Sequence, residues 1–417
     1  MGIGSLSLLL LLGVIVIGVI RKINLGILAI AVATILGYGS GMFKAKEIIA
    51  GFNASLFITL LGVTLFFAIV QENGCLQLLM KKIMNIFGKW VWMVPIILFA
   101  IGWLLAAMGP GSIPSLPVIA ALAVPLAHET GYNPIMLMMI GDVATFSGRF
   151  TPITPEGILV TKLMNVQGFY NLLPSVLGNT FIGAAIISVI TFLFYKGYAV
   201  KISDKALERK NTEPFSTEQF ITLGSIIVML DLVIFSKIDI GLAAFLVATV
   251  LILTGVGKQE SAMKNVPWNT LLLVSGVGVL MNLVISTGGI KLLAGTMSSV
   301  MNAKTAAPLA GLMAGCMYSS TIGVVLPTLL PTIGQLVNNV PGADAAQIIS
   351  TIGITSACTG FSPTSAVGAI IMGAYEGDQE YAKQKSADKL FLELTLWSTF
   401  CIFFFPALSF VGFFVFK

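Results

Sequence analysis

The chain has 417 residues, of which 57% are hydrophobic and 10% are charged, and its net charge is +5. Because a soluble protein carries roughly 25% charged residues, this composition excludes a soluble globular domain and predicts an all-α polytopic membrane protein. The single histidine, His128, excludes a multi-histidine metal site, and no two cysteines form a CxxC pair. The basic residues lie between the apolar runs, so we expect them to set membrane topology and not to bind nucleic acid.

The first half of the chain contains apolar runs that predict five membrane crossings. They cover residues 3–20, 25–42, 53–70, 133–166 and 172–195. After the third crossing, two further apolar runs within 91–127 are separated by Met108-Gly109-Pro110-Gly111-Ser112. Each of these runs is shorter than the roughly 20 residues that a spanning helix needs, so we expect a re-entrant hairpin here.

The fourth crossing is interrupted by residues 146–157, which read Phe-Ser-Gly-Arg-Phe-Thr-Pro-Ile-Thr-Pro-Glu-Gly. Two prolines and two glycines break a helix and free backbone groups at membrane depth. Such a break is tolerated where it is buried in protein or lines a cavity. The segment is therefore expected to form part of a binding site.

The second half follows the same order after a polar linker, 196–216. Its crossings cover 217–235, 240–255, 266–285, 344–373 and 390–414, and its hairpin covers 305–338. The second hairpin tip is Ser319-Ser320-Thr321-Ile322-Gly323, and the second break is Thr359-Gly360-Phe361-Ser362-Pro363-Thr364-Ser365. Matching landmarks recur 212–216 residues apart, which predicts two repeats, 1–195 and 217–417.

The number of crossings predicts how the repeats are oriented. Five is odd, so the second repeat should be inverted relative to the first. With both termini outside and the linker 196–216 in the cytoplasm, fifteen Lys and Arg residues fall on the cytoplasmic side and seven outside, while Arg149 is the last of the 23. This excess agrees with the positive-inside rule and predicts a multi-pass protein of the cell (inner) membrane.

The two tips and two breaks are expected to meet near the bilayer centre and form a binding site. Half-helix N-termini there suit an anion, and half-helix C-termini suit a cation such as Na⁺. The predicted substrate-binding residues are Gly111, Ser112, Arg149, Thr151, Thr154, Ser319, Ser320, Thr321, Ser362 and Thr364. The predicted cation-binding residues are Gly109, Ser112, Asp142, Gly148, Ser319, Ser320, Thr359 and Gly360. Any single hydroxyl has the alternative of bonding only its own helix backbone.

Arg149 is the charged residue that most needs a partner. A charge at this depth costs at least ~2.5–3.5 kcal/mol on insertion scales. The planar guanidinium pairs well with a carboxylate, which favours an anionic substrate. The alternative is an internal ion pair with Asp142 or Glu156, and Asp142 is also a candidate for a coupling proton or cation.

Several of these motifs carry a resemblance to a known superfamily. A hairpin tip plus a broken helix, used twice, resembles the plan of the ion transporter superfamily, which includes the divalent anion:sodium symporters. Ser319-Ser320-Thr321 resembles the Ser-Asn-Thr motif of its hairpins, with Ser320 in place of Asn, and residues 265–273, Asn-Val-Pro-Trp-Asn-Thr-Leu-Leu-Leu, also look like that superfamily. The first tip, residues 108–112, looks closer to the malonate/dicarboxylate carrier family.

The resemblance implies an elevator-type secondary transporter of a small organic anion, such as malonate or a C4-dicarboxylate, coupled to Na⁺ or H⁺. It implies that hairpins and broken helices move together. The other crossings, including the fifth of each half, would form a scaffold that makes a homodimer. No cofactor is expected beyond Na⁺ as a coupling ion.

Four other functions stay open on the sequence alone. The same fold can carry another anion, or exchange Na⁺ for H⁺ with Asp142 as the proton site. A channel would need a selectivity filter, and nothing in the sequence resembles one. An intramembrane protease would need paired aspartates, for which Asp142 and Asp231 are the candidates. Residues 139–142, Met-Ile-Gly-Asp, lack a glycine at 139, and Asp231 falls on a predicted scaffold helix, so the chain is expected not to be an enzyme.

Overall fold

The structure is a computed structural model that describes residues 2–21, 23–75, 78–79, 82, 91–200, 213–317, 321–363 and 365–415. Throughout these ranges the regular secondary structure is helical, with no strand. Seven of the described helices are long and apolar enough to cross a membrane, by length and composition. The prediction of an all-α multi-pass membrane protein is confirmed at this level.

The helices of the first half begin at residues that the sequence marks as caps. Asn24, Asn53 and Asn133 each accept a hydrogen bond from a backbone N–H of the helix that follows. The helices are α1 (Ile3–Arg21), α2 (Leu25–Ser40), α3 (Ala45–Ile49), α4 (Ala54–Glu72), α6 (Val94–Ala107), α7 (Ser112–Thr130), α8 (Pro134–Gly148), α9 (Pro155–Asn165) and α10 (Leu173–Phe194).

The helices of the second half lie close to the predicted runs. They are α11 (Thr217–Ile234), α12 (Ile240–Leu253), α13 (Gln259–Asn265), α14 (Trp268–Ser286), α15 (Gly289–Val300), α16 (Ala306–Cys316), α17 (Leu326–Leu329), α18 (Ile333–Asn339), α19 (Ala345–Cys358), α20 (Ala366–Glu376), α21 (Gln379–Gln384) and α22 (Ala387–Phe410). A π-helical turn, Thr321–Val325, precedes α17, and a 3-10 turn, Leu330–Thr332, follows it. The short helices α3, α13, α15 and α21 were not predicted.

Helices of the two halves pack against each other through glycines. Helix α2 lies on α14, where a Cβ at Gly276 would sit 2.3 Å from the Gly26 carbonyl oxygen. Helix α4 lies on α12, where a Cβ at Gly62 would sit 2.3 Å from the Gly241 oxygen. Small residues allow such close approach in membrane helix pairs. Each second crossing therefore contacts the third crossing of the other half.

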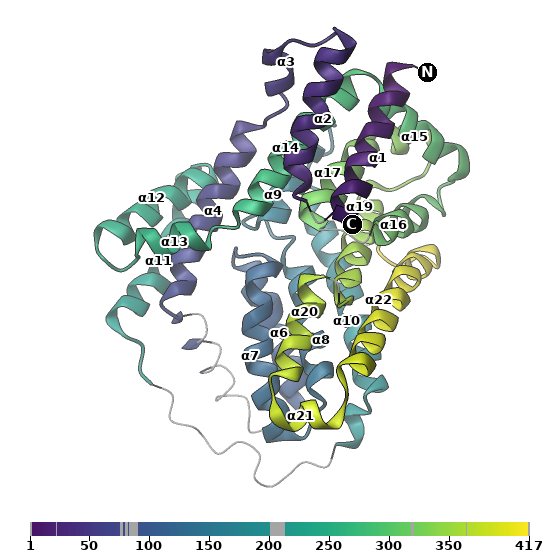
Figure 1. The fold of residues 1–417 in the computed structure, drawn as a ribbon. Coiled ribbons are helices and arrows are strands. Elements are labelled where there is room, and N and C mark those ends of the chain that lie inside the picture. Colours follow the sequence, from purple (N-terminus) through teal and green to yellow (C-terminus); the bar gives the residue numbers. More distant parts are fainter. Residues whose placement is uncertain are drawn as a thin grey trace.

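Figure 1 shows how these pairs are distributed. Helices α1, α2, α14 and α15 gather in the upper part, α11–α13 gather around α4, and α6–α8, α10 and α20–α22 form the lower part. Helices α6 and α8 pack together, as do α16 and α19. This arrangement places the hairpin arms beside the broken helices.

The fifth crossings, α10 and α22, both pack on α19. Helix α10 packs mainly on α8 and α19, and α22 packs mainly on α16 and α19. Their main partners are thus broken helices and a hairpin arm. Across the interface of α10 and α19, the buried Asn179 side chain donates to Ser350 Oγ at 3.2 Å.

Candidate substrate site

The two helix breaks share one hydrogen-bond pattern. Thr154 caps α9: its Oγ1 accepts from the Gly157 N–H and donates to the Arg149 carbonyl oxygen. Ser365 caps α20 in the same way, since its Oγ accepts from the Gly368 N–H and donates to the Gly360 carbonyl oxygen. In this hydrogen-bond pattern Gly360, Ser365 and Gly368 lie 211 positions after Arg149, Thr154 and Gly157, one fewer than the shortest spacing of the landmarks in the sequence. Gly360 therefore occupies the place of Arg149, so one break carries a charge and the other does not.

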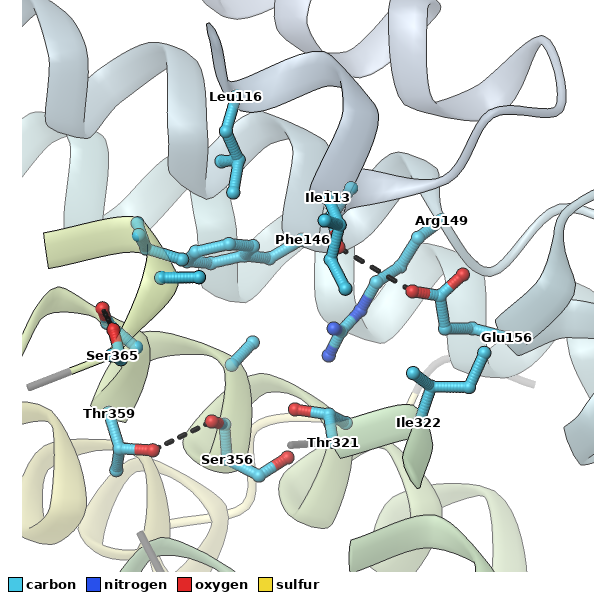
Figure 2. Close-up of a pocket in the computed structure, with 15 residues that line it drawn as sticks. Ile113, Leu116, Phe146, Arg149, Glu156, Thr321, Ile322, Ser356, Thr359 and Ser365 are labelled. Atoms are coloured by element: carbon cyan, nitrogen blue, oxygen red, sulfur yellow. Dashed lines mark hydrogen bonds between the residues drawn. The ribbon is translucent and has the colours of Figure 1, made fainter. Parts of the chain in front are cut away.

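A cavity of about 310 Å³ lies between the first hairpin tip and the two breaks (Figure 2). Its polar lining is formed by Ser112, Arg149, Glu156, Thr321, Ser356, Thr359, Gly360 and Ser365. Its apolar lining is formed by Ile113, Leu116, Phe146, Ile322, Ala357, Ala366 and Val367.

Three helices begin at this cavity. Ser112 is the first residue of α7, Glu156 is the second of α9, and Ala366 is the first of α20. The free backbone N–H groups and the positive end of the helix dipole at such positions favour an anion. The ends of α8 and α19 lie at the same place, where Arg149 and Thr359 are the C-cap residues.

Arg149 is buried, with 4% of its surface exposed, yet its guanidinium is poorly satisfied. Its Nη2 donates to the Gly353 carbonyl oxygen at 3.0 Å, and its Nε has no hydrogen-bond partner. Its Cζ lies 5.8 Å from the ring centre of Phe146 and 5.1 Å from that of Phe150, within cation–π range. Among the residues the structure describes, no carboxylate lies within 4.0 Å of it. The predicted internal ion pair is therefore absent from this conformation.

Glu156 is a charged neighbour of Arg149. Its side chain is 3% exposed, its Oε1 accepts from Ser112 Oγ at 3.5 Å, and its Oε2 has no hydrogen-bond partner. A Cβ at Gly111 would sit 2.8 Å from Oε2. The carboxylate thus lies directly against the hairpin tip, opposite the guanidinium (Figure 2).

The glycines of the first tip are required by the backbone. Gly109 and Gly111 have φ angles of +129° and +77°, which side chains other than glycine's rarely adopt. Gly109 also packs against Phe67 of α4, where a Cβ would sit 1.9 Å from the ring. Thr151 Oγ1 donates to the Ala107 carbonyl oxygen at 2.7 Å, which holds the tip on the break.

The predicted residues occupy three kinds of place. Ser112, Arg149, Thr321, Thr359 and Gly360 line the cavity. Gly109, Gly111, Gly148, Thr151, Thr154 and Ser362 are buried in the tip and breaks around it or shape their backbone, without lining it. Ser319, Ser320 and Thr364 lie outside the described residues.

Asp142 is buried in α8 and does not line the cavity. It is 2% exposed, and its Oδ1 has no hydrogen-bond partner. Asp231 is exposed on α11, so the two aspartates of the protease alternative occupy different environments. Within the described ranges, no three His, Cys, Asp or Glu residues are grouped to hold a metal ion. The Na⁺ ligands stay a prediction.

Sequence reasoning did not assign a binding role to several lining residues. Glu156 was considered only as a partner for Arg149, although a carboxylate two residues into a half-helix at membrane depth is itself a signal. Ser356 lies one helical turn before Thr359, and its hydroxyl resembles many ordinary helix hydroxyls. From the sequence, Phe146 looks like an ordinary core aromatic residue. In the structure its ring lies beside the Arg149 guanidinium.

A cavity enclosed by a hairpin tip and two helix breaks is typical of membrane transporters. Residues 1–147 match the family model described as the dicarboxylate carrier protein MatC N-terminus. Among solved structures, the chain is similar to the YdaH transporter of Alcanivorax borkumensis, described as having an unusual topology, with a TM-score of 0.53 and 13% identity over 87% of this chain and 86% of that one. Comparison with curated proteins finds no match. Over residues 1–147 the resemblance to the dicarboxylate carrier family is confirmed, and the overall fold is similar to that of a transporter.

Proposed function

We propose that this protein is a secondary active transporter of a small organic anion, a dicarboxylate such as malonate or a C4-dicarboxylate. The observation that carries the proposal is Arg149: a buried guanidinium at a cavity wall, with an unused Nε–H and no carboxylate within 4.0 Å among the described residues. A substrate carboxylate would accept two parallel hydrogen bonds from such a fork. It would also remove the cost of leaving the charge unpaired.

The rest of the cavity suits the second end of such a molecule. Ser112, Thr321 and Ser356 supply hydroxyls, and three helix N-termini supply backbone donors and a positive field. The volume of about 310 Å³ lies at the lower end of the ~300–1,000 Å³ range of ligand pockets, which favours a small substrate. The match of residues 1–147 to a dicarboxylate carrier model supports the same class.

The proposed mechanism is an elevator in which two inverted repeats, 1–195 and 217–417, alternate the exposure of one site. The recurring glycine crossings and matched N-caps support the repeat. The mobile part would contain α6–α10 and α16–α22, with α10 and α22 included because they pack on its helices. The scaffold would contain α1–α4 and α11–α15 and would form the homodimer.

The remaining expectations belong to the same proposal. We place the chain in the cell (inner) membrane, with both termini outside and the linker 196–216 in the cytoplasm, as the Lys and Arg distribution favours. Transport would be driven by Na⁺ or H⁺. The carbonyl ends of α8 and α19 and the predicted cation residues around them are the candidate Na⁺ ligands.

The melting temperature of the purified protein tests the proposal. A ligand that binds the folded state raises this temperature by mass action. We expect malonate or succinate to raise it, and the neutral analogue malonamide to leave it unchanged. Comparing Na⁺ with K⁺ as the only metal cation shows whether Na⁺ is required. No rise with any carboxylate would contradict the proposal and favour a different anion.

A further inference from the structure

Glu156 separates two cavities. The first is the cavity of about 310 Å³ at Arg149, and the second, of about 490 Å³, lies between the first hairpin tip, α4 and the start of α14. Glu156, Ile113 and Ile322 line both. Since Ile113 and Ile322 are apolar, Glu156 is the ionisable group of this shared wall.

The second cavity crosses the boundary between the proposed mobile part and the proposed scaffold. On the mobile side it is lined by Pro110, Pro155 and Glu156, and on the scaffold side by Thr64 and the end of α4 at Gln71 and Glu72. In the predicted orientation that end of α4 faces the cytoplasm. The cavity therefore gives Glu156 a route towards solvent that does not pass Arg149.

Few charged groups face Glu156. Arg149 acts on it from the break, and Glu72 shares the second cavity. Lys162, on α9 itself, bonds instead to Ser55 and Thr59 of α4, each at 2.9 Å. The other packed segments, α10, α14 and 321–332, contain no charged residue, and His128 and Glu129 lie at the far end of α7. Arg149 and the ligand in the cavity are therefore the main influences on the charge of Glu156.

We propose that Glu156 carries the proton that couples anion transport to the proton gradient. This inference rests on the proposed function. Without substrate, the Glu156 carboxylate partly offsets the Arg149 charge. A dicarboxylate bound at Arg149 would bring two further negative charges beside a buried carboxylate whose Oε2 has no hydrogen-bond partner. Like charges at a buried site favour protonation of one group.

The proton balance of this step is simple. Glu156 takes one proton from the side on which substrate enters and releases it on the other side after the substrate leaves, and no bond of the substrate changes. By linkage, a proton on Glu156 strengthens substrate binding by the same factor by which substrate strengthens proton binding. Proton and anion therefore cross together.

The experiment compares wild type with Glu156→Gln, which imitates the protonated state, in proteoliposomes. One assay measures exchange of labelled malonate for unlabelled malonate, and the other measures accumulation driven by an imposed pH gradient. We expect gradient-driven accumulation to be lost in Glu156→Gln, and exchange to be reduced far less than accumulation. Wild-type affinity should fall by up to about tenfold per pH unit as the pH rises, whereas the affinity of Glu156→Gln should not change with pH. Glu376→Gln, at the far end of α20, is the matched control and should behave as wild type.

The outcomes separate this inference from the function on which it rests. Accumulation by Glu156→Gln equal to that of wild type would overturn the inference alone. Absence of any carboxylate exchange by wild type would overturn the proposed function as well. If the variant does not fold, proton uptake by solubilised wild type on adding malonate decides: uptake supports the inference, and its absence overturns it.

Discussion

At the scale of the residue, the site is organised by one charge that the protein leaves incompletely paired. Arg149 has five N–H donors, and the structure gives it one carbonyl acceptor and two aromatic rings. Burying an unpaired charge is costly. In the proposed transporter, the carboxylate of a bound substrate would supply the missing acceptor. Both the affinity for the substrate and the selectivity for anions would then come from the Arg149 guanidinium.

Arg149→Lys tests whether the Arg149 guanidinium provides the affinity for anions. Lysine keeps the charge but loses the planar fork, so it gives up at least one charge-assisted hydrogen bond, worth about 1.5–3 kcal/mol. We expect malonate affinity to fall roughly 10- to 100-fold, as measured by calorimetry. Arg21→Lys, at the exposed end of α1, is the matched control and should bind as wild type. An unchanged affinity of Arg149→Lys would remove Arg149 from the substrate site.

Residue type alone was enough to predict that Arg149 belongs to the candidate site, because an arginine inside an apolar run is unusual at any position. Ser356 could not be found in this way, since a helix hydroxyl looks the same whether it faces a cavity or its own backbone. Glu156 lies between two cavities because of how α4 and α14 pack. The pattern of residues within a single helix cannot predict that packing.

At the scale of the element, the two breaks are built by caps. Pro155 follows Thr154, and its fixed φ suits the first position of α9. A Cβ at Gly157 would sit 1.9 Å from the Thr151 carbonyl oxygen, so the loop folds tightly over the new helix. The cap of α9 thereby holds the backbone of Arg149, through the hydrogen bond from Thr154 to its carbonyl oxygen.

Thr154→Ala removes this cap. Loss of an N-cap hydroxyl costs about 0.5–2 kcal/mol, so we expect a lower melting temperature, together with weaker malonate binding because Arg149 is less firmly placed. Thr154→Ser keeps the hydroxyl and should restore both properties. Equal melting temperatures for the alanine variant and wild type would show that the cap does not stabilise the break.

The two helix breaks were predictable because proline, glycine and hydroxyl residues interrupt otherwise apolar runs. The short helices α13 and α21 were not, because they are polar segments outside those runs. The helices on which α10 and α22 pack were not predicted either. Their scaffold assignment came from a resemblance, and the polar groups they bury against α19 became visible only in the fold.

At the scale of the whole molecule, the central question is whether one part slides against the other. Lys162 of α9 donates to Ser55 and Thr59 of α4, at 2.9 Å each, across the proposed boundary. Helix α4 also packs on α12 and α13, which belong to the proposed scaffold. An elevator movement must therefore break the contacts of Lys162.

Cross-linking tests this movement. Cysteines at Ser55 and Lys162, in a variant whose four native cysteines are replaced by alanine, can be joined by a short bifunctional thiol reagent. We expect the joined protein to bind malonate, as measured by melting temperature, but not to transport it. Each single-cysteine variant, treated in the same way, should transport normally. Full transport by the joined protein would contradict sliding at this boundary.

Uptake of labelled malonate by proteoliposomes that contain the wild-type chain tests the central claim most directly. We expect uptake above that of empty liposomes, competed by succinate and unlabelled malonate and reduced in Arg149→Lys. Absence of uptake for every carboxylate tested, under both Na⁺ and pH gradients, would contradict the assignment of the Arg149 cavity to organic anion transport.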